Sequence, residues 1–264
     1  MYYFKKLINF FVSKTSGDLY CLLRSFFEKV LYGQKRNLYF NNNIYFRKFE
    51  EKKKIIYFPD KERSRLYSRG YEYRLKTLSE MYLLNEIKFK NKDVIVDCGA
   101  NIGEIKLIFD NLNIQIDYHA FEPGEQEFQC LKKNLNSKNL YNLGLWKTNG
   151  LLRFYEKTDT ADSSFIKNNA FNKTSLKKVK KLDNLIFKNI KLFKVEAEGA
   201  EPEVLLGAKK ILNKIEYISV DCGPERGPKL EKTFKDVKKI LNESKFNLLK
   251  KSKLRDVYLF NNIR

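Results

Sequence analysis

The chain has 264 residues, of which 43% are hydrophobic, so it can bury the core of one domain and still carry an extension. Its four cysteines are too few and too far apart for a zinc site or a disulfide framework, which favours a reducing cytoplasm. No stretch of 18 apolar residues is present, which excludes a membrane-spanning helix. The formal net charge of +20 is typical of proteins that bind nucleic acid, anionic membranes or phosphorylated substrates, but lysines spread along a whole chain are also typical of solvated surface.

The first 33 residues are predicted to form two helical pieces, separated at Ser16–Gly17. In the second piece we expect Asp18 as the N-cap and Gly33 as the stop. Its apolar residues follow helical spacing, namely Leu19, Leu22, Leu23, Phe26, Phe27 and Val30. Such a stripe belongs to the core or to a partner surface. Two partners remain open, the inner face of a membrane touched peripherally through residues 1–31, and a second copy in a homodimer.

Residues 44–49 and 55–58 alternate in the manner of a β-hairpin. Together with the two helices they are predicted to form an N-terminal extension, residues 1–69, ahead of the main domain, residues 70–264. A helix through Leu75, Leu78 and Tyr82 leads into that domain.

The most informative stretch is V-I-V-D-C-G-A-N-I-G-E, residues 94–104. A β-branched run typical of a buried strand ends at Asp97, and Gly99 and Gly103 then open the way to an amphipathic helix. The loop lacks the G-x-G-x-x-G spacing of a dinucleotide site. S-adenosylmethionine, which has no phosphate, suits this shorter loop, and Glu122 lies 19 residues after Gly103, near the offset at which an acid reaches a ribose diol.

After this loop, strands and helices alternate, which predicts a parallel sheet with right-handed crossovers. We expect strands at 114–121, 141–145, 151–155, 190–195 and 215–220, and a terminal hairpin of 246–249 with 256–260. The hydroxyl-rich turn 160–165 is placed where it can reach a ligand. This predicts an α/β, Rossmann-like three-layer sandwich of the class I methyltransferase type, with a seven-stranded, mostly parallel sheet.

A second chemical cluster lies at the end of the strand near residue 195. Alternation places Lys194, Glu196 and Glu198 on one face, where a buried central strand normally carries apolar residues, and Asp221 ends the next strand. Two interpretations remain open, a direct role in the site and a structural Lys194–Glu196 ion pair.

Several motifs together resemble the FkbM-type family of S-adenosylmethionine-dependent methyltransferases. They are V-D-C-G-A-N-I-G-E (96–104), F-E-P (121–123), G-L-W with L-R-F (144–154), L-D-N-L (182–185) and K-V-E-A-E-G-A-E-P-E-V-L-L-G-A (194–208). Where the family usually has K-I-D-V-E-G-A-E, Glu196 replaces the Asp. Residues 1–60 are outside the resemblance.

The resemblance implies that the cofactor is S-adenosylmethionine. The residues expected to bind it are Asp97, Gly99, Ala100, Asn101, Gly103, Glu122, Pro123 and Ser164. It also implies an acceptor hydroxyl on a sugar, a sugar nucleotide or a surface-polysaccharide unit, and places the turn at 196–198 beside the transferred methyl.

For the chemistry we expect Glu196 or Asp221 to take the proton of the acceptor hydroxyl, with Lys194 or Glu198 orienting the site. Glu196 and Asp221, at the ends of neighbouring strands, leave a divalent ion such as Mg²⁺ open, but two carboxylates are a small set for it and no metal ligand is assigned.

Two alternatives follow from the charge, methylation of RNA and methylation of a phosphorylated small molecule. The chain lacks the Asn/Asp-Pro-Pro-Tyr turn of base-amino methyltransferases, so no nucleic-acid partner is expected. A non-enzymatic protein with a relic cofactor fold, docked on a membrane or bound to a partner, is the third alternative.

Overall fold

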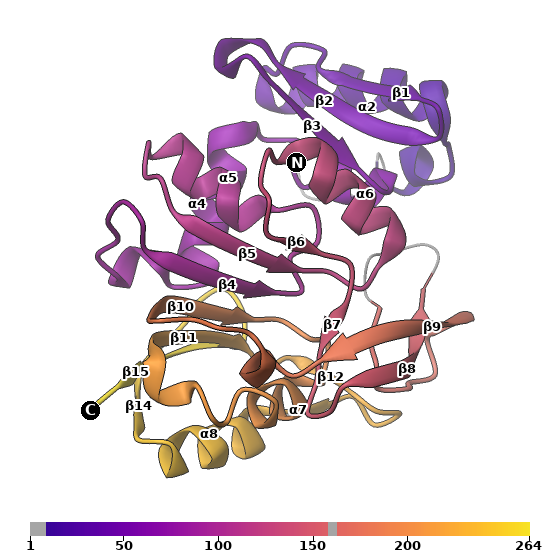
Figure 1. The fold of residues 1–264 in the computed structure, drawn as a ribbon. Coiled ribbons are helices and arrows are strands. Elements are labelled where there is room, and N and C mark those ends of the chain that lie inside the picture. Colours follow the sequence, from indigo (N-terminus) through magenta and orange to yellow (C-terminus); the bar gives the residue numbers. More distant parts are fainter. Residues whose placement is uncertain (1–8, 158–162) are drawn as a thin grey trace. The chain divides into compact units, whose positions relative to one another are not determined.

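The computed structural model describes residues 9–157 and 163–264. Residues 1–8 of the first expected helical piece and residues 160–162 of the hydroxyl-rich turn therefore lie outside the described residues. The chain divides into two compact units, Met1–Leu75 and Lys76–Arg264 (Figure 1).

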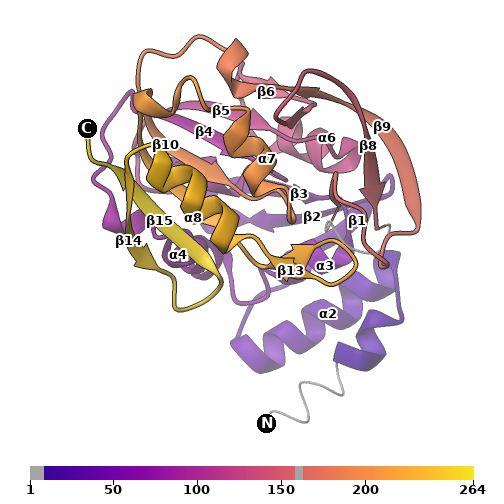
Figure 2. The ribbon, with the colours of Figure 1, turned by 90° about the horizontal axis from the view of Figure 1, so that it is seen from below.

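In the first unit, α2 (Gly17–Tyr32) packs against a three-stranded antiparallel sheet of β1 (Leu38–Asn41), β2 (Ile44–Phe49) and β3 (Lys54–Phe58), followed by α3 (Lys61–Arg65) (Figure 2). The break at residues 16–17 and the hairpin are confirmed. Gly33 ends α2 in the left-handed conformation, as expected.

The structure also corrects two details of this unit. Ser16, not Asp18, occupies the N-cap of α2, and Asp18 lies exposed in the first turn. The strand β1 was not anticipated. Asn42 and Asn43 both have positive φ and form the two-residue turn that joins β1 to β2, a conformation that asparagine tolerates better than most residues.

A buried ion pair connects α2 to the sheet of the first unit. The fully buried Arg47 guanidinium donates to both carboxylate oxygens of Glu28, at 2.7 and 2.8 Å, and also to Asn37 Oδ1 and the Ser64 carbonyl. Ser68 Oγ donates to the same carboxylate at 2.5 Å. The hydrogen-bonding groups of the pair are therefore well satisfied.

Replacing Arg47 by Met is expected to lower the free energy of unfolding by about 3–5 kcal/mol, because the Glu28 carboxylate would stay buried without its cation. Urea denaturation of the full chain, followed by circular dichroism, measures this. Arg36→Met, at an exposed arginine of the same unit, is the control. An equal loss in both variants would contradict a special role for Arg47.

The second unit contains a seven-stranded sheet of order β14-β15-β11-β10-β4-β5-β6. β15 runs antiparallel to its neighbours β11 and β14, and the remaining pairs are parallel. The strands are β4 (Val94–Cys98), β5 (Asp117–Phe121), β6 (Leu140–Tyr141), β10 (Ile190–Val195), β11 (Ile215–Asp221), β14 (Phe246–Lys251) and β15 (Val257–Asn262). This confirms the predicted class I methyltransferase sheet.

Helices cover both faces of this sheet, as expected for a three-layer sandwich. Figure 1 shows α5 (Glu104–Asn111) and α6 (Glu125–Asn134) on one face, and α7 (Glu201–Leu206) and α8 (Phe234–Glu243) on the other. α4 (Tyr71–Met81) precedes β4. An apolar cluster fills the core between sheet and helices, with Phe193, Val195, Leu205 and Ile218 fully buried.

The expected strand at 141–145 is wrong as a single element. β6 ends at Tyr141, and β7 (Gly144–Leu145) joins a separate sheet with β8 (Gly150–Glu156) and β9 (Lys173–Lys180). Asn142, between them, donates its side-chain amide to the Glu122 carbonyl, which fixes the turn. β9 was not anticipated because its only two apolar residues, Leu176 and Val179, are three positions apart and so fall on opposite faces of the strand, which leaves no apolar alternation.

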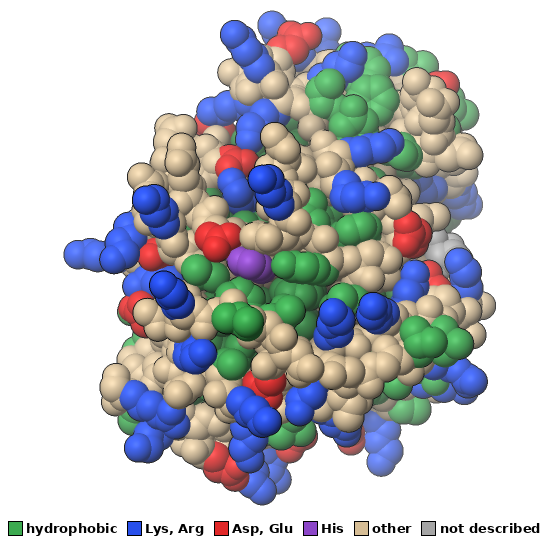
Figure 3. Space-filling model, in the orientation of Figure 1, with side chains coloured by type: hydrophobic (Ala, Val, Ile, Leu, Met, Phe, Trp, Pro, Cys, Tyr) green, Lys and Arg blue, Asp and Glu red, His purple; other side chains and the backbone are tan. Residues whose placement is uncertain are grey.

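Among the described residues, no helix combines the length and apolar character needed to cross a bilayer. Lys and Arg side chains are scattered over the face seen in Figure 3 and do not gather into one stripe there.

Candidate functional site

The glycine loop, residues 99–103, follows β4 and lies against the ends of β5 and β10. The amides of Gly99 and Ala100 both donate to the Phe121 carbonyl at the end of β5, at 3.0 and 3.1 Å. Gly99 has φ +71°, and a Cβ built there would lie 2.0 Å from the Glu196 carbonyl oxygen. Only glycine therefore allows the loop to approach the end of β10 this closely.

Gly99→Ala is expected to cost about 2–4 kcal/mol of unfolding free energy, because a backbone carbonyl must move in addition to the strain of positive φ. Gly227→Ala is the matched control, since Gly227 has φ +68° with nothing within 4 Å of the added Cβ. Thermal or urea unfolding compares the two variants. A loss no larger than that of Gly227→Ala would show that the close approach does not matter.

Glu122, at the end of β5, holds the other side of the loop. Its Oε2 accepts from the Asn101 amide at 2.8 Å and its Oε1 from the Gly124 amide at 2.7 Å. Burial, and then the nearby Glu127, raise the pKa of Glu122 to about 8 against the effect of these two amides. Ala100 is buried, and Pro123 follows the acid, half-buried.

Asn101 offers the loop an unused acceptor. It has φ +49°, and its buried Oδ1 has no hydrogen-bond partner among the described residues. A buried acceptor of this kind is costly unless a ligand supplies the donor. Hydroxyl and ammonium groups, both present on S-adenosylmethionine, are such donors, so the residues present fit this cofactor.

Lys194 connects the glycine loop to the end of β10. Its Nζ lies 3.0 Å from Asp97 Oδ1 and 3.1 Å from Glu196 Oε2, and it donates to the Gly99 carbonyl at 2.7 Å. Burial opposes the charge of Lys194, but Asp97 and Glu196 outweigh it and hold its pKa well above the ordinary value. Asp97 also accepts from Tyr118 Oη at 2.6 Å. The Lys194–Glu196 ion pair, one of the two interpretations of this cluster, is present in the structure.

A second cation, Arg255, bridges the carboxylates at the ends of β10 and β11. Its guanidinium contacts Glu196 Oε1 at 3.0 Å, Asp221 Oδ2 at 2.5 Å and Glu225 Oε1 at 2.8 Å. Tyr82 Oη donates to Glu196 Oε2 at 2.5 Å. Burial, and then Glu196, raise the pKa of Asp221 to about 7, although Arg255 opposes the shift.

These contacts decide how well the carboxylates would suit a divalent ion. Glu196 and Asp221 already share the Arg255 cation, so the pair does not fit Mg²⁺ as it stands. Within residues 9–157 and 163–264, no three His, Cys, Asp or Glu side chains form a group that could hold a metal ion.

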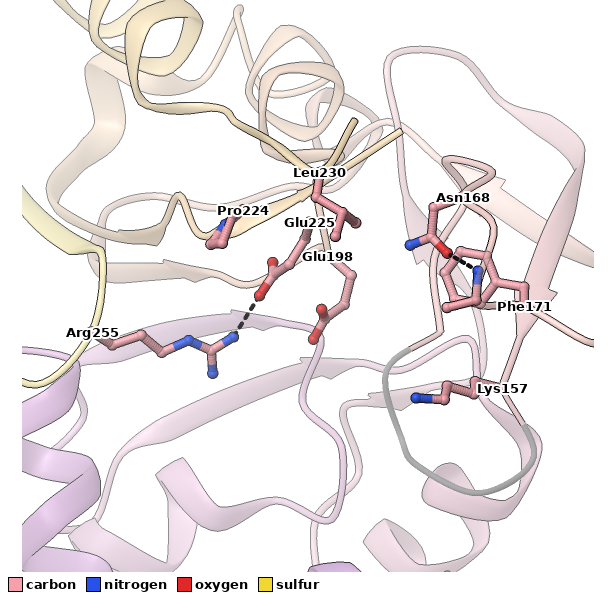
Figure 4. Close-up of a pocket in the computed structure, with 9 residues that line it drawn as sticks. Lys157, Asn168, Phe171, Glu198, Pro224, Glu225, Leu230 and Arg255 are labelled. Carbon is pink, nitrogen blue, oxygen red and sulfur yellow. Dashed lines mark hydrogen bonds and ion pairs between the residues drawn. The ribbon is translucent and has the colours of Figure 1, made fainter. Parts of the chain in front are cut away.

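A cavity of about 250 Å³ opens beside this ion network (Figure 4). Glu198 lines it and has φ +48°, a conformation that non-glycine residues rarely adopt. The other residues lining it are Lys157, Asn168, Ala170, Phe171, Pro224, Glu225, Leu230 and Arg255.

Ser164 fixes the strained turn at the wall of this cavity. Its hydroxyl donates to the Glu198 carbonyl at 2.7 Å, and its backbone pairs with Tyr155 at 2.8 and 2.9 Å. This hydroxyl, expected at the cofactor, is thus committed to the turn that carries Glu198.

Glu201 stabilises the same turn through hydrogen bonds to its backbone amides. It is fully buried, and its carboxylate accepts from the amides of Ala197 and Gly199, both at 3.0 Å, and from Thr233 Oγ1 at 2.8 Å. Burial raises the pKa of Glu201 to about 7.

The raised pKa of Glu201 predicts how stability depends on pH. The folded chain holds this proton more tightly than the unfolded chain, where a Glu titrates near 4.3, so the associated stabilisation is complete below about pH 4 and lost as the pH rises through about 7. Glu201→Gln stays neutral and is expected to match the wild type near pH 4 and to exceed its stability by up to about 3 kcal/mol at pH 8. Urea denaturation across this range tests it, and a difference independent of pH would contradict it.

Sequence reasoning missed Arg255, Tyr82 and Glu225. Arg255 stands among other bases in K-S-K-L-R-D, and Tyr82 continues the apolar stripe of a helix, so neither carries a local signal. Glu225 lies in the C-G-P-E-R-G-P loop, where the glycines and prolines indicate a rigid turn but not a side chain that enters a site.

The family model described as "Methyltransferase FkbM domain" matches residues 97–248. No curated protein matches the sequence.

Three solved structures illustrate the likeness. A methyltransferase FkbM from Methylobacillus flagellatus KT shares 16% identity at a TM-score of 0.48, over 75% of this chain and 52% of that one, so this chain spans about half its length. A SAM dependent methyltransferase from Aquifex aeolicus shares 13% identity at a TM-score of 0.40, over 71% and 94% of the two chains. A putative RNA methyltransferase from Pyrococcus horikoshii shares 16% at a TM-score of 0.36, over 72% and 82%.

Proposed function

The chain belongs to the FkbM methyltransferase family, and we propose that it transfers a methyl group from S-adenosylmethionine to a hydroxyl of a sugar, a sugar nucleotide or a surface-polysaccharide unit. The observation that carries this proposal is the cavity beside Glu198, which adjoins the ion network reaching back to the glycine loop.

The lining of the cavity suits a sugar. Carboxylates such as Glu198 and Glu225 and the amide of Asn168 can bind hydroxyl groups, and the ring of Phe171 offers a flat apolar face to the C–H side of a pyranose. Lys157 at the wall of the cavity can bind an anionic group of the acceptor, such as the diphosphate of a sugar nucleotide.

The reaction requires alignment and the removal of one proton. S-adenosylmethionine supplies the electrophilic methyl carbon when bound, and an in-line displacement needs the acceptor oxygen on the far side of that carbon. Glu198 lines the cavity, whereas Asp221 is fully buried behind Arg255. We therefore assign Glu198 as the general base, and assign positioning roles to Glu196, Asp221 and Lys194.

The test is methyl transfer from labelled S-adenosylmethionine to a panel of free sugars, nucleotide sugars and polysaccharide fragments, with RNA as a further acceptor. We expect label on a sugar hydroxyl and none on RNA. Transfer to RNA alone, with binding that weakens steeply as salt increases, would overturn the proposal.

A further inference from the structure

The helix α2 presents its apolar side outward and buries polar side chains. Arg24, Ser25 and Glu28 lie on its buried side beside Tyr20 and Cys21, and Glu28 pairs there with Arg47. A surface helix of a globular protein normally has the opposite arrangement, with charged residues facing water.

An exposed apolar stripe results on the first unit. On α2 the spacing of three and four residues keeps its members on one side of the helix, and the short helix of residues 9–13 adds two phenylalanines. The exposed fractions run from 53% to 60%, and the members are Phe10, Phe11, Leu19, Leu22, Phe26 and Val30. We call this set the apolar stripe.

The stripe is held in place by contacts on its inner side. Arg24 donates to Asn9 Oδ1 at 2.9 Å, which ties the short helix to α2. Lys61 Nζ donates to the carbonyls of Ser13 and Thr15, at 2.5 and 2.8 Å, and fixes the turn between the two helices. The apolar side chains are thus presented by a braced pair of helices.

The charges around the stripe select its partner. Among the exposed residues from 9 to 36, four are cations, namely Lys14, Lys29, Lys35 and Arg36, and one, Asp18, is an anion. Two copies meeting stripe to stripe would bring these cations together, which is unfavourable. An anionic lipid surface instead supplies both the apolar layer for the side chains and the opposite charge at the level of the head groups.

We propose that the first unit docks on an anionic membrane surface through the apolar stripe, with α2 lying in the plane of the interface. The docking is independent of the chemistry in the second unit. It would keep the chain beside acceptors assembled on a membrane.

Vesicle sedimentation with the full chain tests this proposal. We expect the wild type to bind phosphatidylcholine vesicles containing phosphatidylglycerol at least about 10-fold better than pure phosphatidylcholine vesicles, and to bind less well in high salt. The double variant Leu22→Asp, Phe26→Asp should lose at least about 10-fold in binding to the anionic vesicles.

The matched control is Leu151→Asp with Leu176→Asp, at exposed apolar residues of the second unit, with exposed fractions of 70% and 66%. It should bind vesicles like the wild type, and circular dichroism should show all variants folded. Failure of the wild type to bind, or equal binding by the stripe variant, would overturn the proposal. So would a dimer in analytical ultracentrifugation that the stripe variant dissociates, because a second copy would then cover the stripe.

Discussion

Glu198→Gln is expected to lower kcat for methyl transfer by about 10²-fold or more, the range lost when a general base is removed. Glu198 lines the cavity, and Ser164 holds its backbone carbonyl at 2.7 Å, so the neutral amide should keep the shape of the turn. Affinity for S-adenosylmethionine should stay near the wild-type value, because Glu198 lies outside the glycine loop. Single-turnover kinetics with labelled cofactor measure the rate, and calorimetry measures the affinity.

Glu196→Gln tests whether Glu196 is a positioning residue or the general base itself. Glu196 accepts from Tyr82 and pairs with Lys194 and Arg255, so the amide would meet several donors with one remaining acceptor. We expect this variant to lose stability as well as rate, whereas Glu198→Gln should lose rate alone. A full rate in Glu198→Gln, together with a slow but equally stable Glu196→Gln, would assign the base to Glu196.

Arg255→Ala is expected to lower both stability and turnover. The change leaves the buried Asp221 and the partly buried Glu196 next to each other without their shared cation. Fully buried pairs broken in this way lose about 3–5 kcal/mol, and we expect about 2 kcal/mol here because part of the Arg255 side chain is exposed. Turnover should fall by about 10²-fold, because both strand ends that shape the acceptor cavity would shift.

The loss in Arg255→Ala should also depend on pH. Since the pKa of Asp221 is already raised to about 7, the unpaired carboxyl can take up a proton in acid, and the destabilisation should grow as the pH rises above 7. Urea denaturation at pH 6 and 8.5 compares the two conditions, and Arg255→Lys, which keeps one charge, should lie between the wild type and Ala. Unchanged unfolding and turnover in Arg255→Ala would contradict the bridging role.

The strongest sequence signals were those with short-range physical causes. The β-branched run before Asp97, the glycines after it and the strand–helix alternation each reflect a local requirement of a parallel sheet, and the structure has that sheet. The turn between β6 and β7 was not predicted, because it depends on the contact of Asn142 with Glu122, 20 residues away.

In the candidate site too, the residues with a local sequence signal were predicted and those held by distant contacts were not. Asp97, Lys194 and Glu196 were predicted because they interrupt or end apolar strands, and Glu122 because it lies 19 residues after Gly103. Tyr82 and Arg255 contact Glu196 across 114 and 59 residues of sequence, so no local pattern could reveal them.

The binding of S-adenosylhomocysteine, measured by titration calorimetry on the full chain, tests the central claim most directly. The account predicts one site per chain, strongly weakened in Glu122→Ala, which removes the acid beside the loop, and unchanged in Arg36→Met, at an exposed residue of the other unit. No heat of binding to the folded wild-type chain, or affinity that Glu122→Ala leaves intact, would contradict it.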